Sequence, residues 1–134
     1  MRILIFGGTG IIGSELSSRL SLNNTVFVSS RKHRDDKNNI HFIKGNAQDI
    51  SFIKTLADDW DVIIDLMNYP SSVFSSNHDV LFNKTKHYVF VSSSRVYSDS
   101  GISPITEKSP VHLHISDDKF FLSSNEYVSP ALAV

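Results

Sequence analysis

Three glycines near the N-terminus, Gly7, Gly10 and Gly13, have the spacing of a turn that holds phosphate groups. The apolar run 3–6 comes directly before them and has the pattern of a strand buried on both faces. In the segment 12–20, isoleucine and leucine recur every four residues, which predicts a helix with one apolar stripe. Glycines at such a junction let backbone N–H groups approach a pyrophosphate closely, because no Cβ atom stands in the way. The motif predicts a dinucleotide-binding turn, and the alternative is a glycine turn that binds nothing.

Cationic residues follow the second predicted strand, 25–28. These residues and their neighbours are Ser29, Ser30, Arg31, Lys32 and Arg34. A carboxylate at this place would favour the free ribose 2′-hydroxyl of NAD, and none is present. Serine hydroxyls and a guanidinium group suit a 2′-phosphate better. The pattern therefore favours NADP, with NAD as the alternative cofactor and a solvated cationic loop as the alternative interpretation.

The remaining apolar runs alternate between strand and helix patterns. Further strands are predicted at 40–43, 62–64 and 88–91, and helices at 52–56 and at about 72–84, with Val73, Phe74, Val80 and Leu81 facing inward. This alternation predicts an α/β fold with a Rossmann-type, doubly wound parallel sheet of about five strands in the order 3-2-1-4-5. The ligand crevice is expected between strands one and four, at their carboxyl ends.

Beyond Ser98 the periodic pattern ends. We therefore expect a dinucleotide-binding domain over residues 1–97 and an irregular tail over 98–134. The strand 88–91 is expected to form an apolar sheet edge, which favours a homodimer or a tail folded over that edge.

The composition excludes several classes of function. A net charge of -1 gives no electrostatic footprint for nucleic acid or for an anionic membrane. The sequence contains no cysteine, and no stretch approaches the roughly 18 apolar residues that span a bilayer. His112 and His114 have no third ligand at metal-binding spacing, so no metal site is expected. The expected location is the cytoplasm.

Several motifs together make the chain resemble the N-terminal part of the extended short-chain dehydrogenase/reductase family, the NAD-dependent epimerase/dehydratases. The resemblance depends on the stretches 7–13 (GGTGIIG), 45–49 (GNAQD), 60–65 (WDVIID) and 91–97 (VSSSRVY), and on Tyr127. The glycine turn and the second strand end give Gly7, Thr9, Gly10, Ile11, Ile12, Gly13, Ser30 and Arg31 as cofactor-binding residues. The resemblance adds Asn46 and Ala47 near the adenine, and Met67 and Asn68 beside the nicotinamide ribose.

The resemblance also implies catalytic roles. Ser93 matches the family serine that hydrogen-bonds the substrate oxygen undergoing hydride transfer. Tyr127 matches the tyrosine of the family's Tyr-x-x-x-Lys pair, which gives or takes the proton while the lysine lowers its pKa. Ala131 stands where that lysine is expected. A tyrosine without its cationic neighbour keeps a pKa near 10, which is unsuited to proton transfer at neutral pH.

Two functions are consistent with this pattern. The first is an NAD(P)-binding domain of an epimerase/dehydratase-like protein that acts on a nucleotide-sugar-like substrate, or that derives from such an enzyme. The second is a non-catalytic dinucleotide-binding or regulatory module. No sixth strand and no substrate-binding lobe are recognisable after residue 98, so we expect a truncated relative of the family.

Overall fold

The computed structural model describes residues 1–92, 97, 101 and 103–111. The chain forms two compact units, of which the first comprises Met1–Met67 and Ser76–Val91 and the second Asn68–Ser75 and Ser92–Val134. The first unit contains the sheet. In the second unit, the described residues include a bridge between Tyr97 and Val111. The division of the chain at residue 97 stays a prediction.

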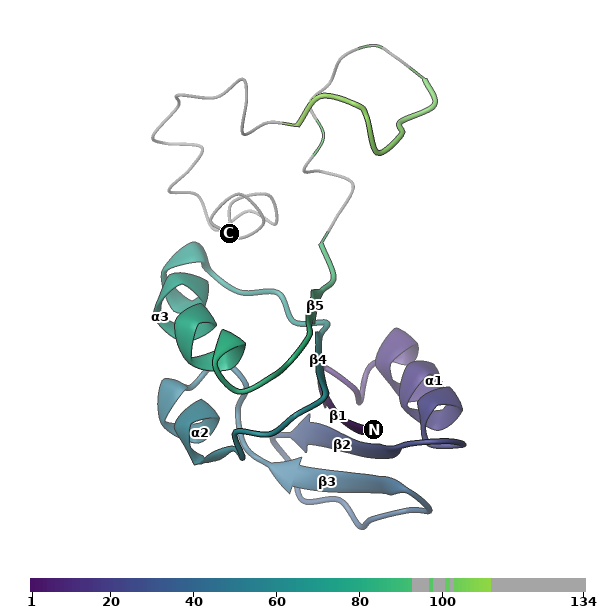
Figure 1. Cartoon of the computed structure of the whole chain (residues 1–134), viewed down its shortest axis with the longest axis vertical. Coiled ribbons are helices and arrows are strands. Elements are labelled where there is room, and N and C mark those ends of the chain that lie inside the picture. Colours follow the sequence, from purple (N-terminus) through teal and green to yellow (C-terminus); the bar gives the residue numbers. More distant parts are fainter. Residues whose placement is uncertain (93–96, 98–100, 102, 112–134) are drawn as a thin grey trace. The chain divides into compact units, whose positions relative to one another are not determined.

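Five parallel strands form one sheet in the first unit (Figure 1). They are β1 (Arg2–Phe6), β2 (Thr25–Ser30), β3 (Ile40–Lys44), β4 (Val62–Asp65) and β5 (Tyr88–Phe90). Their order is β3-β2-β1-β4-β5 and every neighbouring pair is parallel, which confirms the predicted Rossmann-type topology.

Helices cover both faces of this sheet. Helix α1 (Ile11–Leu20) lies on one face and α2 (Ile50–Thr55) on the other (Figure 1). Alternate residues of β1 therefore enter different cores: Ile3 and Ile5 pack in the α1-side core, and Leu4 and Phe6 in the α2-side core. Since both faces are buried, the central strand is a continuous apolar run rather than an alternating one. None of the helices within the described ranges is long and apolar enough to cross a lipid bilayer.

The predicted apolar stripe of α1 is wrong at its first residue. Leu16 and Leu20 pack against the sheet as expected, but the Ile12 side chain is 71% exposed. In the first helical turn, Gly13 occupies the sheet-facing position, and Ser17 follows it one turn later with its hydroxyl donating to the Gly13 carbonyl at 2.7 Å. Ile12 precedes Gly13 by about 100° of helical rotation and therefore projects away from the sheet.

Most other boundaries differ from the prediction by one or two residues, and three of these differences concern the ends of β2, β5 and α3. Strand β2 continues to Ser30, because Ser29 and Ser30 are buried and remain paired with β3. Strand β5 ends at Phe90 rather than at residue 91, although the Val91 N–H still donates to the Asp65 carbonyl at 2.9 Å. Helix α3 (Ser71–Phe82), which contributes residues to both units, ends two residues before the predicted Lys84.

Candidate functional site

A hollow of about 290 Å³ lies at the carboxyl ends of the strands in the first unit. Residues at or just after the ends of four strands line it: Gly7 and Thr9 after β1, Ser29, Ser30 and Arg31 at the end of β2, Gly45, Asn46, Ala47 and Gln48 after β3, and Met67 after β4. Ligands of open parallel α/β sheets bind at this edge, where the strand order reverses between β1 and β4.

The glycine turn lines this hollow through Gly7 and Thr9 and leads into the start of α1. Gly7 has φ +75°, a left-handed conformation that favours glycine, and its carbonyl accepts the Gly10 N–H at 3.1 Å. At Gly13, a Cβ atom would lie 2.4 Å from the Gly7 carbonyl oxygen, so the helix contacts the turn at a distance that only glycine allows. The third glycine of the motif therefore permits close packing of the helix on the turn.

The start of α1 has the features of an anion site. Its N-cap residue is Gly10, which offers no side-chain acceptor, and the first turn contains no acidic residue. The first backbone N–H groups of a helix have no partner within the helix, and the helix dipole makes this end partially positive. A pyrophosphate is the kind of group that such an end binds.

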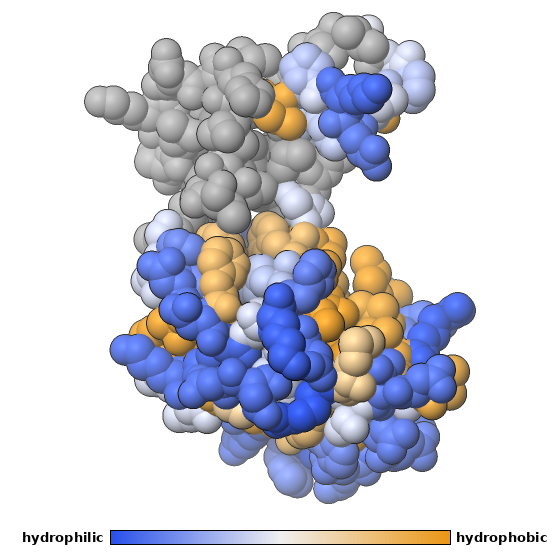
Figure 2. All heavy atoms as spheres, in the orientation of Figure 1, coloured by the Kyte–Doolittle hydropathy of each residue, from blue (hydrophilic) through white to orange (hydrophobic). Residues whose placement is uncertain are grey.

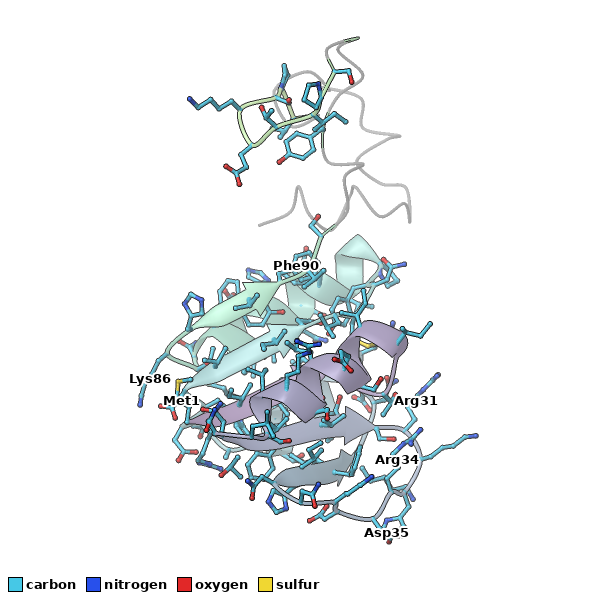
Figure 3. The ribbon with its side chains drawn as sticks, turned by 90° about the vertical axis from the view of Figure 1, so that its right-hand side faces the viewer. Met1, Arg31, Arg34, Asp35, Lys86 and Phe90 are labelled. Atoms are coloured by element: carbon cyan, nitrogen blue, oxygen red, sulfur yellow. The ribbon has the colours of Figure 1, made fainter. Side chains whose placement is uncertain are left out.

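A second hollow, of about 510 Å³, continues from the end of β2. It is lined by Thr9, Ser30, Arg31, Lys32 and Arg34. In the described part of the chain, neither hollow is lined by an Asp or Glu side chain. Figure 3 shows Arg31 and Arg34 at the opposite end of the sheet from Met1 and Lys86. The cations expected from the sequence are therefore gathered at the carboxyl edge.

The turn after β4 is held by a buried carboxylate. Asp65 is 0% exposed, and its Oδ1 accepts the Met67 N–H at 2.9 Å. Its Oδ2 accepts the hydroxyl of Tyr88, from the neighbouring strand β5, at 2.6 Å. Burial of the phenol raises the pKa of Tyr88 well above its ordinary value, and the charge of Asp65 adds to this. Tyr88 therefore stays protonated at neutral pH, and Asp65 positions Met67, which lines the hollow.

Replacing Tyr88 by phenylalanine should destabilise the first unit. The change removes one donor from a buried carboxylate, which costs about 1–3 kcal/mol of unfolding free energy when the charge is left with fewer partners. Urea denaturation monitored by circular dichroism would measure the loss. Tyr97→Phe removes the same hydroxyl from a residue of the second unit and serves as control. Equal midpoints for the two variants would contradict a stabilising role of the Tyr88–Asp65 bond.

A family model for the NAD-dependent epimerase/dehydratase family matches residues 3–115. The chain belongs to this family. The match extends over both the glycine turn and the ends of all five strands, so the hollow described above lies within the matched region. A comparison with curated protein sequences gives no significant match.

Solved structures with the same fold include epimerases and dehydrogenases. The UDP-Glc/GlcNAc 4-epimerase from Campylobacter jejuni matches with a TM-score of 0.70 at 16% identity, covering 98% of this chain and 45% of its own. The UDP-N-acetylglucosamine 4-epimerase from Bacillus cereus matches with a TM-score of 0.64 at 19% identity, covering 83% and 47%. A uronate dehydrogenase from Agrobacterium tumefaciens in complex with NAD matches with a TM-score of 0.56 at 17% identity, covering 72% and 42%. The chain spans less than half the length of each, and at these identities the likeness shows the fold alone.

The structure brings most of the predicted cofactor-binding residues together. Those that line the first hollow, of about 290 Å³, are Gly7, Thr9, Ser30, Arg31, Asn46, Ala47 and Met67. Gly10 and Gly13 shape the turn, and Ile11 and Ile12 are exposed in the first turn of α1. Asn68 belongs to the second unit. The catalytic candidates Ser93 and Tyr127, and also His112 and His114, lie outside the described residues.

Three residues that line the hollow are absent from the predicted set: Ser29, Gly45 and Gln48. Ser29 and Gly45 stand at or just after the carboxyl end of a strand, and Gln48 follows in the loop after β3; this position is the signal that would have identified them. Among residues 1–92, 97, 101 and 103–111, no group of three or more metal-ligating side chains is close enough to hold an ion.

Proposed function

We propose that this chain binds a nicotinamide adenine dinucleotide in the hollow at the carboxyl edge of the sheet. The observation that carries the proposal is that the glycine turn and the ends of four strands line one hollow, and that this turn leads directly into the uncapped start of α1. The turn supplies backbone donors for the pyrophosphate. The ends of β2 and β3 line the side on which an adenosine would lie, and Met67 lies after β4, where the nicotinamide half is expected.

Within this proposal, NADP(H) is the preferred cofactor and NAD(H) the alternative. A 2′-phosphate brings about two negative charges, and the second hollow is lined by Arg31, Lys32 and Arg34 together with Ser30. A guanidinium group binds phosphate oxygens through two parallel hydrogen bonds, which an ammonium group does not do. The opposing consideration is that the family is named for NAD, and that the Agrobacterium tumefaciens neighbour was solved with NAD.

Arg31→Ala should weaken NADPH binding by about 1–3 kcal/mol, the value of a lost charge-assisted hydrogen bond, and leave NADH binding almost unchanged. Isothermal titration with each nucleotide measures both affinities. Arg19→Ala is the matched control, because Arg19 is an exposed arginine in the last turn of α1, paired with Glu15. Equal affinities for NADPH and NADH in the unmodified protein would show that the cations form only a solvated loop.

For catalysis we propose the family's arrangement, with Ser93 orienting a carbonyl or hydroxyl oxygen of the substrate and Tyr127 transferring its proton. The two epimerases with the same fold are named for UDP-linked sugars, and this supports a nucleotide-sugar-like substrate. The second candidate function, a non-catalytic binding module, is favoured by Ala131 at the position of the family lysine. An absorbance assay separates the two: NADPH is formed from NADP⁺ with a UDP-sugar, or consumed with an oxidised UDP-sugar, if the protein is an enzyme. A homodimer and a cytoplasmic location stay predictions.

A further inference from the structure

The loop that joins β2 to β3 carries the cations of the second hollow and is fixed at its start. The Lys32 N–H donates to the hydroxyl of Ser30 at 3.3 Å. The Ser30 carbonyl accepts the Gly45 N–H at 2.9 Å, which ties the end of β2 to the end of β3. The cationic segment 31–34 therefore leaves the sheet from a residue that is hydrogen-bonded both to β3 and to the loop.

The same loop returns along the free edge of β3 (Figure 1). Hydrogen bonds of the Asp36 side chain attach it there. Asp36 Oδ1 accepts the Phe42 N–H at 2.8 Å, and Asp36 Oδ2 lies 2.7 Å from His41 Nδ1. Because the Gly45 N–H faces β2, the alternation along a parallel strand directs the Phe42 N–H outward, where the sheet supplies no acceptor. The Phe42 N–H and the His41 ring hold the pKa of the Asp36 carboxyl below its usual value. Asp36 is therefore ionised at neutral pH and remains a strong acceptor.

Phe42 connects this anchor to the cations. The Arg34 guanidinium carbon lies 5.9 Å from the centre of the Phe42 ring, within the range of a cation–π contact. The turn that follows Asp36 is closed by two hydrogen bonds of 3.0 Å between the backbones of Lys37 and Ile40. The segment 31–35 is thus five residues long and held at both ends, which limits the positions that its side chains reach.

We propose that Asp36 is a positioning residue for 2′-phosphate recognition: by binding the Phe42 backbone it holds Arg31 and Arg34 toward the second hollow. This inference rests on the proposed binding of NADP(H). A plainer role is that Asp36 only shields the edge strand β3 from pairing with other chains. The two roles differ in one measurable respect, because shielding has no effect on the discrimination between NADPH and NADH.

The test compares Asp36→Ala with Asp35→Ala. Asp35 stands in the same loop (Figure 3), its side chain is 100% exposed, and its Oδ1 lies 3.5 Å from His33 Nε2. Both variants remove one negative charge near the phosphate, so the direct electrostatic effect cancels in the comparison. We expect the Kd for NADPH to be about fivefold higher in Asp36→Ala than in Asp35→Ala, the effect of one net hydrogen bond, with the Kd for NADH equal in the two. Asp36→Asn keeps an oxygen that accepts the Phe42 N–H and should retain most of the discrimination.

Hydrogen exchange of the Phe42 amide provides a readout without nucleotide, and we expect faster exchange in Asp36→Ala than in Asp35→Ala. Equal NADPH affinities in the two variants would overturn the inference. A parallel loss of NADPH and NADH affinity would also overturn it, because it would indicate general loss of structure. If the unmodified protein binds NADPH more tightly than NADH, either result leaves the proposed function intact. Binding of neither nucleotide by the unmodified protein would instead overturn the proposed function itself, and the inference with it.

Discussion

Gly13→Ala should lower the unfolding free energy by more than about 3 kcal/mol, a large part of the roughly 5–15 kcal/mol of a whole domain. The added Cβ would lie 2.4 Å from the Gly7 carbonyl oxygen and 2.5 Å from the Gly8 Cα. Both are backbone atoms of a turn that follows the central strand, so no flexible side chain can move aside. Added carbon atoms in packed regions ordinarily cost about 1–3 kcal/mol, and contact with backbone raises the cost. Trp60 is the single tryptophan and is buried, so its fluorescence during urea denaturation reports the loss.

Gly10→Ala is the matched control for this change. A Cβ at Gly10 meets only the Gly7 carbonyl oxygen, at 3.4 Å, and the backbone there has an extended conformation open to any residue. We expect this variant to unfold at almost the urea concentration of the unmodified protein. Equal urea midpoints for Gly13→Ala and Gly10→Ala would contradict the close contact between α1 and the glycine turn at Gly13.

The topology of the sheet could be predicted from the sequence because continuous apolar runs, which are typical of buried strands, alternate along the chain with helix patterns. In β1, four consecutive apolar residues alternate between two cores, and a run of this kind is typical of a central parallel strand. Short connections and right-handed crossovers then leave few orders for five such strands. The edges of elements were less predictable: β2 continues through Ser29 and Ser30, whose hydroxyls gave the pattern of a strand end although both residues are buried.

Burial of polar groups depends on partners that are distant in the sequence, and this is where the predictions were weakest. Lys84 was expected in the last turn of a helix, but it is 6% exposed and its Nζ donates to the Leu56 carbonyl at 2.7 Å. It also pairs with the carboxylate of Asp58. A buried ammonium group requires such partners, and the sequence separation of 28 residues between Lys84 and Leu56 leaves no local signal of the contact.

The surface near the candidate site illustrates the same limit. Hydrophilic residues dominate the face shown in Figure 2 below the helices, where β3 and the loop before it lie in Figure 1. From the sequence, the loop 31–39 is a run of charged and polar residues, with alternative interpretations as a phosphate site and as a solvated surface. The contact between Asp36 and Phe42 shows that part of this loop is anchored to the sheet. A local charge pattern does not distinguish an anchored cation from a free one.

Gly10→Val should abolish dinucleotide binding without unfolding the protein. Valine readily adopts the extended conformation of Gly10, which has φ -77° and ψ 177°, and the nearest obstacle to a Cβ atom is the Gly7 carbonyl oxygen at 3.4 Å. The two additional methyl groups would stand at the start of α1, where the pyrophosphate must approach the first backbone N–H groups of the helix. We expect the affinity for NADPH and NADH to fall at least about a hundredfold, or about 2.8 kcal/mol, in isothermal titration.

The control for this last change is Ser18→Val, which adds a branched side chain at an exposed position of the same helix. It should bind both nucleotides as the unmodified protein does, and tryptophan fluorescence should give both variants a native urea transition. A folded Gly10→Val protein that binds NADPH with unchanged affinity would place the nucleotide away from the glycine turn. The hollow beside β2 would remain in such a protein. Adding Arg31→Ala to Gly10→Val would then show whether the cations after β2 are sufficient to bind the nucleotide without the glycine turn. Loss of binding in Gly10→Val with a native transition would instead assign the pyrophosphate to the backbone at the start of α1.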